Sequence, residues 1–188
     1  HSGVPEGFLL AGNGAADLIF RLVYGIRPEK ALIPTPTFLE YEEALKQTKT
    51  QIIRLPLDEN MEIPNDLPEH ISEETELTFL CNPNNPTGIL TGRDLIIRAA
   101  KKALETGTIL VLDECFLDFT GREEDYTMVP WLKEFPNMVI LKAFTKMFSI
   151  PGIRLGYALC SDPDLIHRIR AAGQSWSVNT IASAAGRA

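Results

Sequence analysis

The chain has 188 residues, 45% of them apolar and 23% charged, which is the composition of an ordinary globular protein with one well-buried core. The formal net charge is -7, and Lys and Arg gather on no single stretch, so we expect no nucleic-acid partner. No apolar run approaches the roughly 20 residues that a membrane-spanning helix needs, which argues against a membrane partner.

Short apolar runs alternate with amphipathic stretches along the chain. Seven runs are predicted strands: Phe8–Ala11, Ala31–Pro34, Gln51–Leu55, Leu77–Cys81, Ile109–Asp113, Met138–Lys142 and Leu155–Cys160. Four stretches are predicted helices: Ala15–Tyr24, Thr37–Gln47, Gly92–Glu105 and Asp162–Ala172. Several of the strands are apolar on both faces, as expected when helices cover both sides of a parallel sheet. The alternation predicts an α/β fold with three α/β/α layers and a mainly parallel seven-stranded sheet.

One connection differs from the others. About a dozen residues, with Pro151 and Gly152 among them, separate the strand that ends at Lys142 from the strand that begins at Leu155, which is short for a helical crossover between parallel strands. We therefore expect Leu155–Cys160 to run antiparallel to its predecessor.

The ends of the chain indicate one domain of a longer protein. The first predicted strand begins soon after His1, and Trp176–Ala188 has the pattern of a helix that starts there. We expect residues 1–188 to form one domain that lacks an N-terminal segment and a C-terminal domain. Between the elements, Leu57–Pro68 is polar and contains prolines, and we expect a surface excursion.

The cysteines and histidines bear on location and metal binding. Cys81, Cys115 and Cys160 are odd in number and lie in or beside apolar runs, which predicts buried, reduced thiols in a cytoplasmic protein. The three histidines are scattered without metal-ligand spacing, so we predict no metal site.

The first polar motif follows the first predicted strand and opens a helix. Free amides at a helix start hold a phosphate well, and Gly14, Ala15 and Ala16 would let an anion approach the backbone. The alternative is a simple turn capped by Asn13 or Gly14. A dinucleotide site would have a third glycine where Asp17 stands.

The second motif, Asn82-Pro83-Asn84-Asn85-Pro86-Thr87-Gly88, ends the strand Leu77–Cys81. Its prolines fix the backbone and remove amide donors, while its asparagines offer neutral side chains that both donate and accept. A generic Pro/Asn turn is the alternative, but this order of residues favours a ligand-binding loop.

Charged residues near two strand ends complete the pattern. Asp113, followed by Glu114, lies at the tip of a buried strand, where a carboxylate needs a partner such as a protonated heterocyclic nitrogen. Lys146 lies between apolar neighbours that would lower its pKa and free the amine to attack a carbonyl, and Arg154 follows as a forked phosphate donor. A surface Asp and a solvated loop Lys are the alternatives.

Together these motifs resemble the class I/II aminotransferase family of fold-type I enzymes that use pyridoxal 5′-phosphate (PLP). The run Asn82–Gly88 resembles the family's signature, and Thr145-Lys146 with Arg154-Leu155-Gly156-Tyr157 resembles its lysine block. The resemblance implies that residues 1–188 are the PLP-binding large domain of a homodimer acting on an amino-acid or amine phosphate.

The resemblance also implies roles for single residues. Lys146 would hold the cofactor covalently, and Asp113 would pair with its pyridine nitrogen. Asn85 would bond the phenolic oxygen, and Phe38 would stack on the ring. The phosphate would be held by the following group: Gly14, Ala15, Ala16, Thr145 and Arg154.

Two branches of the family compete. Histidinol-phosphate aminotransferases usually have a Tyr where this chain has Phe116, whereas Asp113–Phe119 and Ser149–Gly152 resemble threonine-phosphate decarboxylases of cobalamin synthesis. Ala143 departs from the Ser or Thr common in the family. In the family, arginines of the small domain hold the substrate carboxylate. Outside this class, an inactive fragment with the same fold and a nucleotide-binding Rossmann-like protein remain alternatives.

Overall fold

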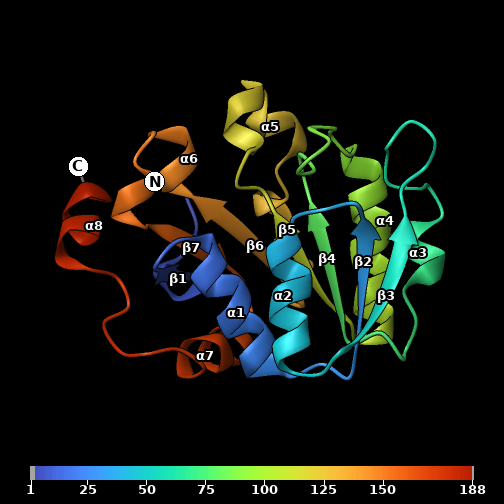
Figure 1. The fold of residues 1–188 in the computed structure, drawn as a ribbon, viewed down its shortest axis with the longest axis horizontal. Coiled ribbons are helices and arrows are strands. Elements are labelled where there is room, and N and C mark those ends of the chain that lie inside the picture. The colour runs from blue at the N-terminus through green and yellow to red at the C-terminus, as the bar shows by residue number, and fades with distance from the viewer. Residues whose placement is uncertain (1–2, 188) are drawn as a thin grey trace.

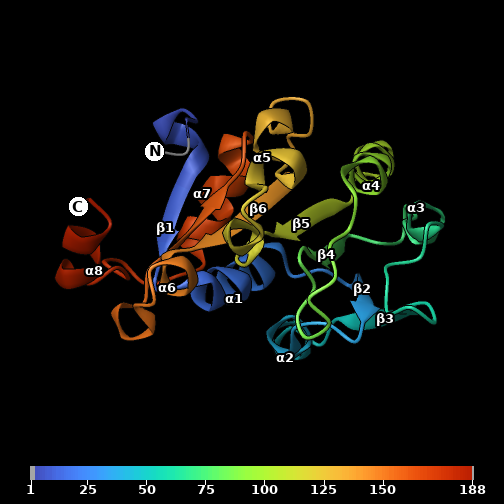
Figure 2. The same ribbon diagram turned by 90° about the horizontal axis from the view of Figure 1, so that it is seen from above.

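In the computed structural model, which describes residues 3–187, one twisted sheet separates two groups of helices (Figures 1 and 2). The seven strands are β1 (Leu9–Gly12), β2 (Lys30–Thr35), β3 (Gln51–Pro56), β4 (Leu77–Cys81), β5 (Ile109–Asp113), β6 (Met138–Ala143) and β7 (Gly156–Leu159). They lie side by side in the order β1-β7-β6-β5-β4-β2-β3. The predicted α/β fold with a seven-stranded sheet is confirmed.

The direction of the last strand also agrees with the sequence analysis. Strand β7 is antiparallel to both of its neighbours, β1 and β6, and every other pair of neighbouring strands is parallel. The chain between β6 and β7 holds only one turn of helix and a short 3-10 helix, Pro151–Ile153. Because this connection is too short to cross the sheet, β7 starts at the edge where β6 ends.

The helices are α1 (Ala15–Ile26), α2 (Leu39–Gln47), α3 (Leu67–His70), α4 (Arg93–Thr106), α5 (Glu123–Tyr126), α6 (Phe144–Met147), α7 (Pro163–Ala171) and α8 (Thr180–Ala185). One face of the sheet is covered by α1, α2 and α7, and the other by α3 and α4 (Figure 2). None of the described helices is long and apolar enough to cross a membrane.

Strand β5 shows why the core has two halves. Leu110 and Leu112 pack on the α4 side, and Val111 packs on the α1 side, because successive side chains of a strand point to opposite faces. All three side chains are fully buried. Cys81, Cys115 and Cys160 are buried free thiols, as the apolar runs around them predict.

Three predicted segments need correction. The excursion 57–68 does not lie wholly on the surface, because Ile63 and Leu67 are buried in the core beneath α4. Helix α2 begins at Leu39 rather than Thr37, and the preceding Phe38 has an extended backbone. The tail helix begins at Thr180 rather than Trp176, since Asn179 caps it by accepting a hydrogen bond from the Ala182 amide. His1 and Ala188 lie outside the described residues.

Candidate active site

The predicted ligand-binding residues gather at the carboxyl ends of β4, β5 and β6, which is the upper edge of the sheet in Figure 1. Ligands of open α/β sheets bind at this edge because the loops there converge. The antiparallel strand β7 starts at the same edge, so the residues just before it join the site.

Asp113 is the last residue of β5 and is only 5% exposed. The hydroxyl of Tyr41 donates a 2.7 Å hydrogen bond to one carboxylate oxygen, and the amide of Cys115 donates a 2.9 Å bond to the other. Burying a carboxylate is costly unless donors surround it, and these two donors satisfy that need from inside the protein.

Tyr41 was not foreseen from the sequence, although it holds Asp113 in place. Its ring stacks on Phe79 with 4.6 Å between centroids and meets the edge of Phe38 at 5.5 Å. Burial, followed by the negative charge of Asp113, raises the pKa of the Tyr41 hydroxyl, so this group remains a hydrogen-bond donor. Local sequence patterns carry no signal for this role, because Asp113 lies 72 positions after Tyr41.

The thiol of Cys81 lies close to the same carboxylate. Burial and the charge of Asp113 raise the pKa of Cys81 to about 12, so the thiol is neutral near pH 7. Its hydrogen-bond acceptor is the carbonyl oxygen of Pro83, at 3.3 Å. Asp113 therefore carries the negative charge of this part of the site.

The side chains of the asparagine loop, Asn82–Gly88, have two different roles. Asn82 is buried and exchanges two hydrogen bonds with the backbone of Thr91, at 2.8 and 3.1 Å. Asn84 accepts a 2.8 Å bond from the Thr37 hydroxyl and donates a 3.1 Å bond to the Pro36 carbonyl. Both side chains thus hold the loop in place and tie it to the segment before α2.

Asn85 has a different position, since its side chain lines a cavity of about 350 Å³ together with Phe116. The Lys146 ammonium lies 5.0 Å from the centroid of the Phe116 ring. Phe116 therefore connects the asparagine loop to the lysine, as a shared ligand site requires.

The surroundings of Lys146 differ from the expectation. Met147 and Phe148 are 47% and 61% exposed, and Lys146 itself is exposed at the edge of the sheet. The apolar neighbours therefore do not cover the amine in this structure, which agrees with the alternative of a solvated lysine in a loop. The local fold does fix the backbone position of Lys146, because this residue lies on the single turn α6 directly after β6.

The start of α1 and Arg154 form a compact cradle. Gly14 caps α1 with φ +86, a left-handed conformation that glycine adopts readily. A Cβ atom at Gly14 would lie 2.7 Å from Arg154 Nη2, and one at Gly156 would lie 2.6 Å from the Ala15 amide nitrogen. Both glycines are thus needed for the close approach of Arg154 and β7 to the amides at the start of α1.

The other predicted phosphate residues lie around this cradle. Ala16 follows Ala15 on the first turn of α1, whose amides have no partner within the helix. Thr145 is buried on α6, and the amide of the preceding Phe144 donates to the carbonyl of Leu155, next to Arg154. The structure therefore brings together a helix start and an arginine, an arrangement suited to a phosphate.

Glu114 points away from the site that Asp113 faces. It is fully buried and lies 3.0 Å from the ammonium of Lys142 on β6, and it accepts bonds from the Thr127 hydroxyl and the Met128 amide. Burial alone would lower the pKa of Lys142, but the carboxylates of Glu114 and Glu123 raise it, so the lysine stays charged. Sequence analysis did not find this cluster.

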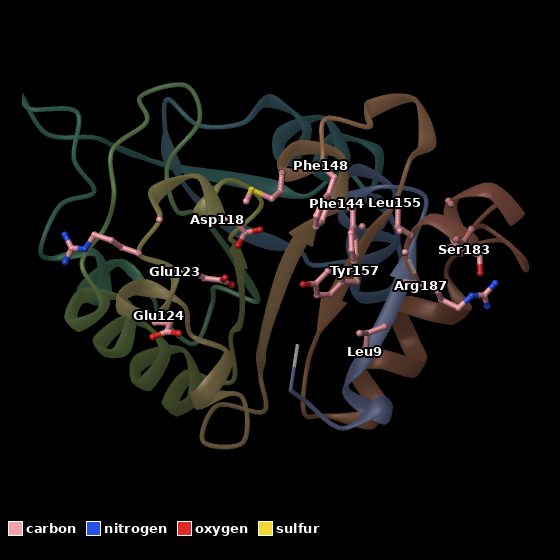
Figure 3. A pocket seen from close by; sticks show the side chains of 18 of the residues that line it. Leu9, Asp118, Glu123, Glu124, Phe144, Phe148, Leu155, Tyr157, Ser183 and Arg187 are labelled. Carbon is pink, nitrogen blue, oxygen red and sulfur yellow. The ribbon is translucent and has the colours of Figure 1, made fainter. Parts of the chain in front are cut away.

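Another cavity, of about 1040 Å³, has a different lining (Figure 3). The acidic side chains Asp118 and Glu123 line one side, and Phe144 and Phe148 line the other. None of the lining residues is a predicted cofactor contact. We therefore place the candidate site at the strand ends and not in this cavity. Among residues 3–187, no group of three or more His, Cys, Asp or Glu is arranged to hold a metal ion.

Residues 4–188 match the family model described as aminotransferase class I and II. The chain belongs to this family. The family uses PLP as its cofactor, and its members include decarboxylases as well as aminotransferases.

Individual relatives represent both branches. The chain is 39% identical to a threonine-phosphate decarboxylase of Salmonella typhimurium, over 99% of this chain and 51% of the relative. It is 34% identical to a histidinol-phosphate aminotransferase of Desulfitobacterium hafniense, over 99% of this chain and 52% of the relative. The crystal structure of the histidinol-phosphate aminotransferase from Clostridium acetobutylicum has a TM-score of 0.87 at 32% identity, covering 95% of this chain and 52% of that one. The chain thus spans about half the length of these relatives.

The site has the chemistry that the family's cofactor requires. PLP carries a phosphate, a pyridine nitrogen, a phenolic oxygen and an aldehyde. The cradle at Gly14 and Arg154 suits the phosphate, and the buried carboxylate of Asp113 suits a protonated ring nitrogen. The residues present therefore fit the cofactor.

Replacing Tyr41 tests whether the buried carboxylate depends on its hydroxyl. Tyr41→Phe should lower the free energy of unfolding by about 1.5–3 kcal/mol, because a charged buried group loses a hydrogen bond. Urea denaturation followed by circular dichroism measures the change. Tyr24→Phe is the matched control, since Tyr24 is 41% exposed, and should change stability by no more than about 0.5 kcal/mol. Equal effects of the two substitutions would contradict the assigned role of Tyr41.

Proposed function

We propose that residues 1–188 are the PLP-binding large domain of an enzyme that decarboxylates L-threonine O-3-phosphate. The observation that carries the proposal is the convergence of Asp113, Asn85 and Lys146 with the Arg154 cradle at one edge of the sheet. The decarboxylase branch is supported by Phe116, which lacks the hydroxyl usual in the aminotransferase branch, and by the 39% identity to a threonine-phosphate decarboxylase.

Each cofactor group would meet a residue of suitable chemistry. Lys146 would hold the cofactor covalently. Asp113 would accept a hydrogen bond from the protonated ring nitrogen. Asn85 would donate to the phenolic oxygen. In support, Asp113 is already fixed by Tyr41 and the Cys115 amide, so its orientation would not depend on the ligand.

The remaining proposed contacts hold the ring and the phosphate. Phe38 would stack on the ring, which agrees with its position against Tyr41, the residue bonded to Asp113. The phosphate would lie on the following group: Gly14, Ala15, Ala16, Thr145 and Arg154. A forked guanidinium and free helix amides together favour one orientation of a dianion, and this orientation would direct the ring toward Asp113.

The protein residues would divide the chemistry between them. When bound, the cofactor supplies an electron sink for the bonding electrons released at the substrate Cα. Asp113 would keep the ring nitrogen protonated, and its own position is held by two donors. The amine of Lys146 would take or return a proton at the substrate Cα. The residues that hold the substrate carboxylate decide which bond breaks, and we propose that they lie outside this chain.

A histidinol-phosphate aminotransferase is the second candidate. It is supported by relatives at 34% identity over nearly the whole chain and by a solved structure at 32% identity. Both candidates act on phosphorylated amines, and both use the same lysine, carboxylate and phosphate cradle.

Lys146→Ala should abolish covalent capture of PLP by borohydride reduction, because the other lysine near the end of β6, Lys142, is buried and paired with Glu114. Mass spectrometry of peptides from the reduced protein locates the label. Lys133→Ala, an exposed lysine after the 3-10 helix Val129–Trp131, serves as the control and should leave the labelling unchanged. Labelling of a different lysine in the unaltered protein would show that Lys146 is not the attachment point.

We also propose that the full-length protein is a homodimer. The support is the resemblance to family members whose active sites lie between subunits, together with strongly exposed apolar side chains such as Leu39, next to Phe38, and Trp176. Large exposed apolar groups are common at subunit contacts. Light scattering after size exclusion should give twice the chain mass, and a fully active monomer at micromolar concentration would contradict the proposal.

The reaction itself separates the two candidates. Full-length protein should release carbon dioxide from L-threonine O-3-phosphate and should not consume 2-oxoglutarate with histidinol phosphate. Carbon dioxide release and 2-oxoglutarate consumption are followed in separate assays with the same protein preparation. Consumption of 2-oxoglutarate with histidinol phosphate, and no carbon dioxide from threonine phosphate, would establish the aminotransferase instead.

A further inference from the structure

Asp17 lies on the first turn of α1, directly after the residues that form the phosphate cradle. Its carboxylate accepts a 2.9 Å hydrogen bond from the Asn13 amide with one oxygen and a 2.9 Å bond from Arg21 Nε with the other. The first bond folds the loop before α1 back onto the helix. Gly12 leaves room for this fold, because a Cβ atom there would lie 2.6 Å from Leu18 Cγ and 3.0 Å from the Asp17 carboxylate.

Arg21 is buried, with only 4% of its surface exposed. Its ion pair with Asp17 is 2.9 Å long, and its Nη2 atom has no hydrogen-bond partner among the described residues. The guanidinium lies against Gly173, where a Cβ atom would come within 2.3 Å of Arg21 Cζ. Gly173 follows the end of α7, and a helix C-terminus attracts a cation.

The charges at this helix start explain why a buried arginine is needed. A phosphate monoester carries about -1.5 to -2 charges near pH 7, and the positive end of α1 is what attracts it. An unpaired carboxylate on the same turn would repel the phosphate. It would also compete with the phosphate for the positive end of the helix dipole. Arg21 neutralises that carboxylate while leaving its hydrogen bond to the loop intact.

We propose that Asp17 and Arg21 are positioning residues of the phosphate site. Asp17 fixes the loop that presents the Ala15 and Ala16 amides, and Arg21 cancels the charge of Asp17. Gly173, 152 positions after Arg21 in the chain, provides the space that Arg21 occupies. The inference rests on the proposed function, because it assumes that the phosphate of PLP binds at the start of α1.

The test compares PLP with pyridoxal, which lacks the phosphate, by equilibrium dialysis with the full-length protein. Arg21→Gln should raise the Kd of PLP about tenfold and leave the Kd of pyridoxal unchanged, because only the phosphate senses the uncovered charge of Asp17. Asp17→Asn with Arg21→Gln should restore PLP binding to within about threefold of the unaltered protein, since the pair is then neutral.

A remote variant gives an independent readout. Gly173→Ala should reproduce the selective loss of PLP binding, because the new methyl group displaces the guanidinium. Arg170→Gln, on the exposed side of α7, and Gly7→Ala, which has open space around it, are the matched controls and should bind both ligands normally.

The outcomes separate this inference from the proposed function. Equal weakening of PLP and pyridoxal binding would reduce the pair to a structural role and overturn the inference, as would unchanged PLP binding in Arg21→Gln. If Arg21→Gln does not fold, Gly173→Ala and the double variant decide by the same criteria. If the unaltered protein binds pyridoxal but gains nothing from the phosphate, the inference fails alone. If it binds neither ligand, the proposed function fails with it.

Discussion

The buried carboxylate of Asp113 is the constraint around which the candidate site is built. An ionised side chain that is 5% exposed destabilises a fold unless donors meet both of its oxygens. One donor is the backbone two residues on, at Cys115, and the other comes from Tyr41 on α2. This second donor requires that β2, α2 and β4 pack closely, since Tyr41 is itself held by Phe79 on β4. The surroundings of this one carboxylate therefore depend on the packing of β2, α2 and β4.

The pair Asp113 and Glu114 shows how a strand end separates two adjacent charges. Their side chains leave the backbone on opposite sides, so Asp113 meets Tyr41 while Glu114 meets Lys142. Lys142 also approaches Glu123, with 2.6 Å between the ammonium and the carboxylate. The lysine therefore ties the segment after β5 to β6, and the site side of Asp113 is left with a single negative charge.

Much of this arrangement could be predicted from the sequence, and the exceptions have physical reasons. The strands, the antiparallel direction of β7 and the position of Lys146 follow from local patterns of apolar and turn-forming residues. Tyr41 could not be found in this way, because its partner lies 72 positions later and only packing brings the two together. The same holds for Arg21 and Gly173. Lys146 is exposed although its sequence neighbours are apolar, because such neighbours bury a side chain only when other elements cover it.

The reversed direction of β7 has a consequence for how the site tolerates change. Because β7 begins where β6 ends, the segment from Phe144 to Leu155 is a closed hairpin connection whose two ends are joined by a backbone hydrogen bond. Lys146 and Arg154, eight positions apart, are therefore carried by one short loop. Such local contacts need little loop-closure entropy and can form early in folding. An inserted or deleted residue in this loop would alter the span between amine and guanidinium, whereas the exposed turn after β3 could change length freely. This connection should therefore tolerate changes of length less than the exposed turns of the chain do.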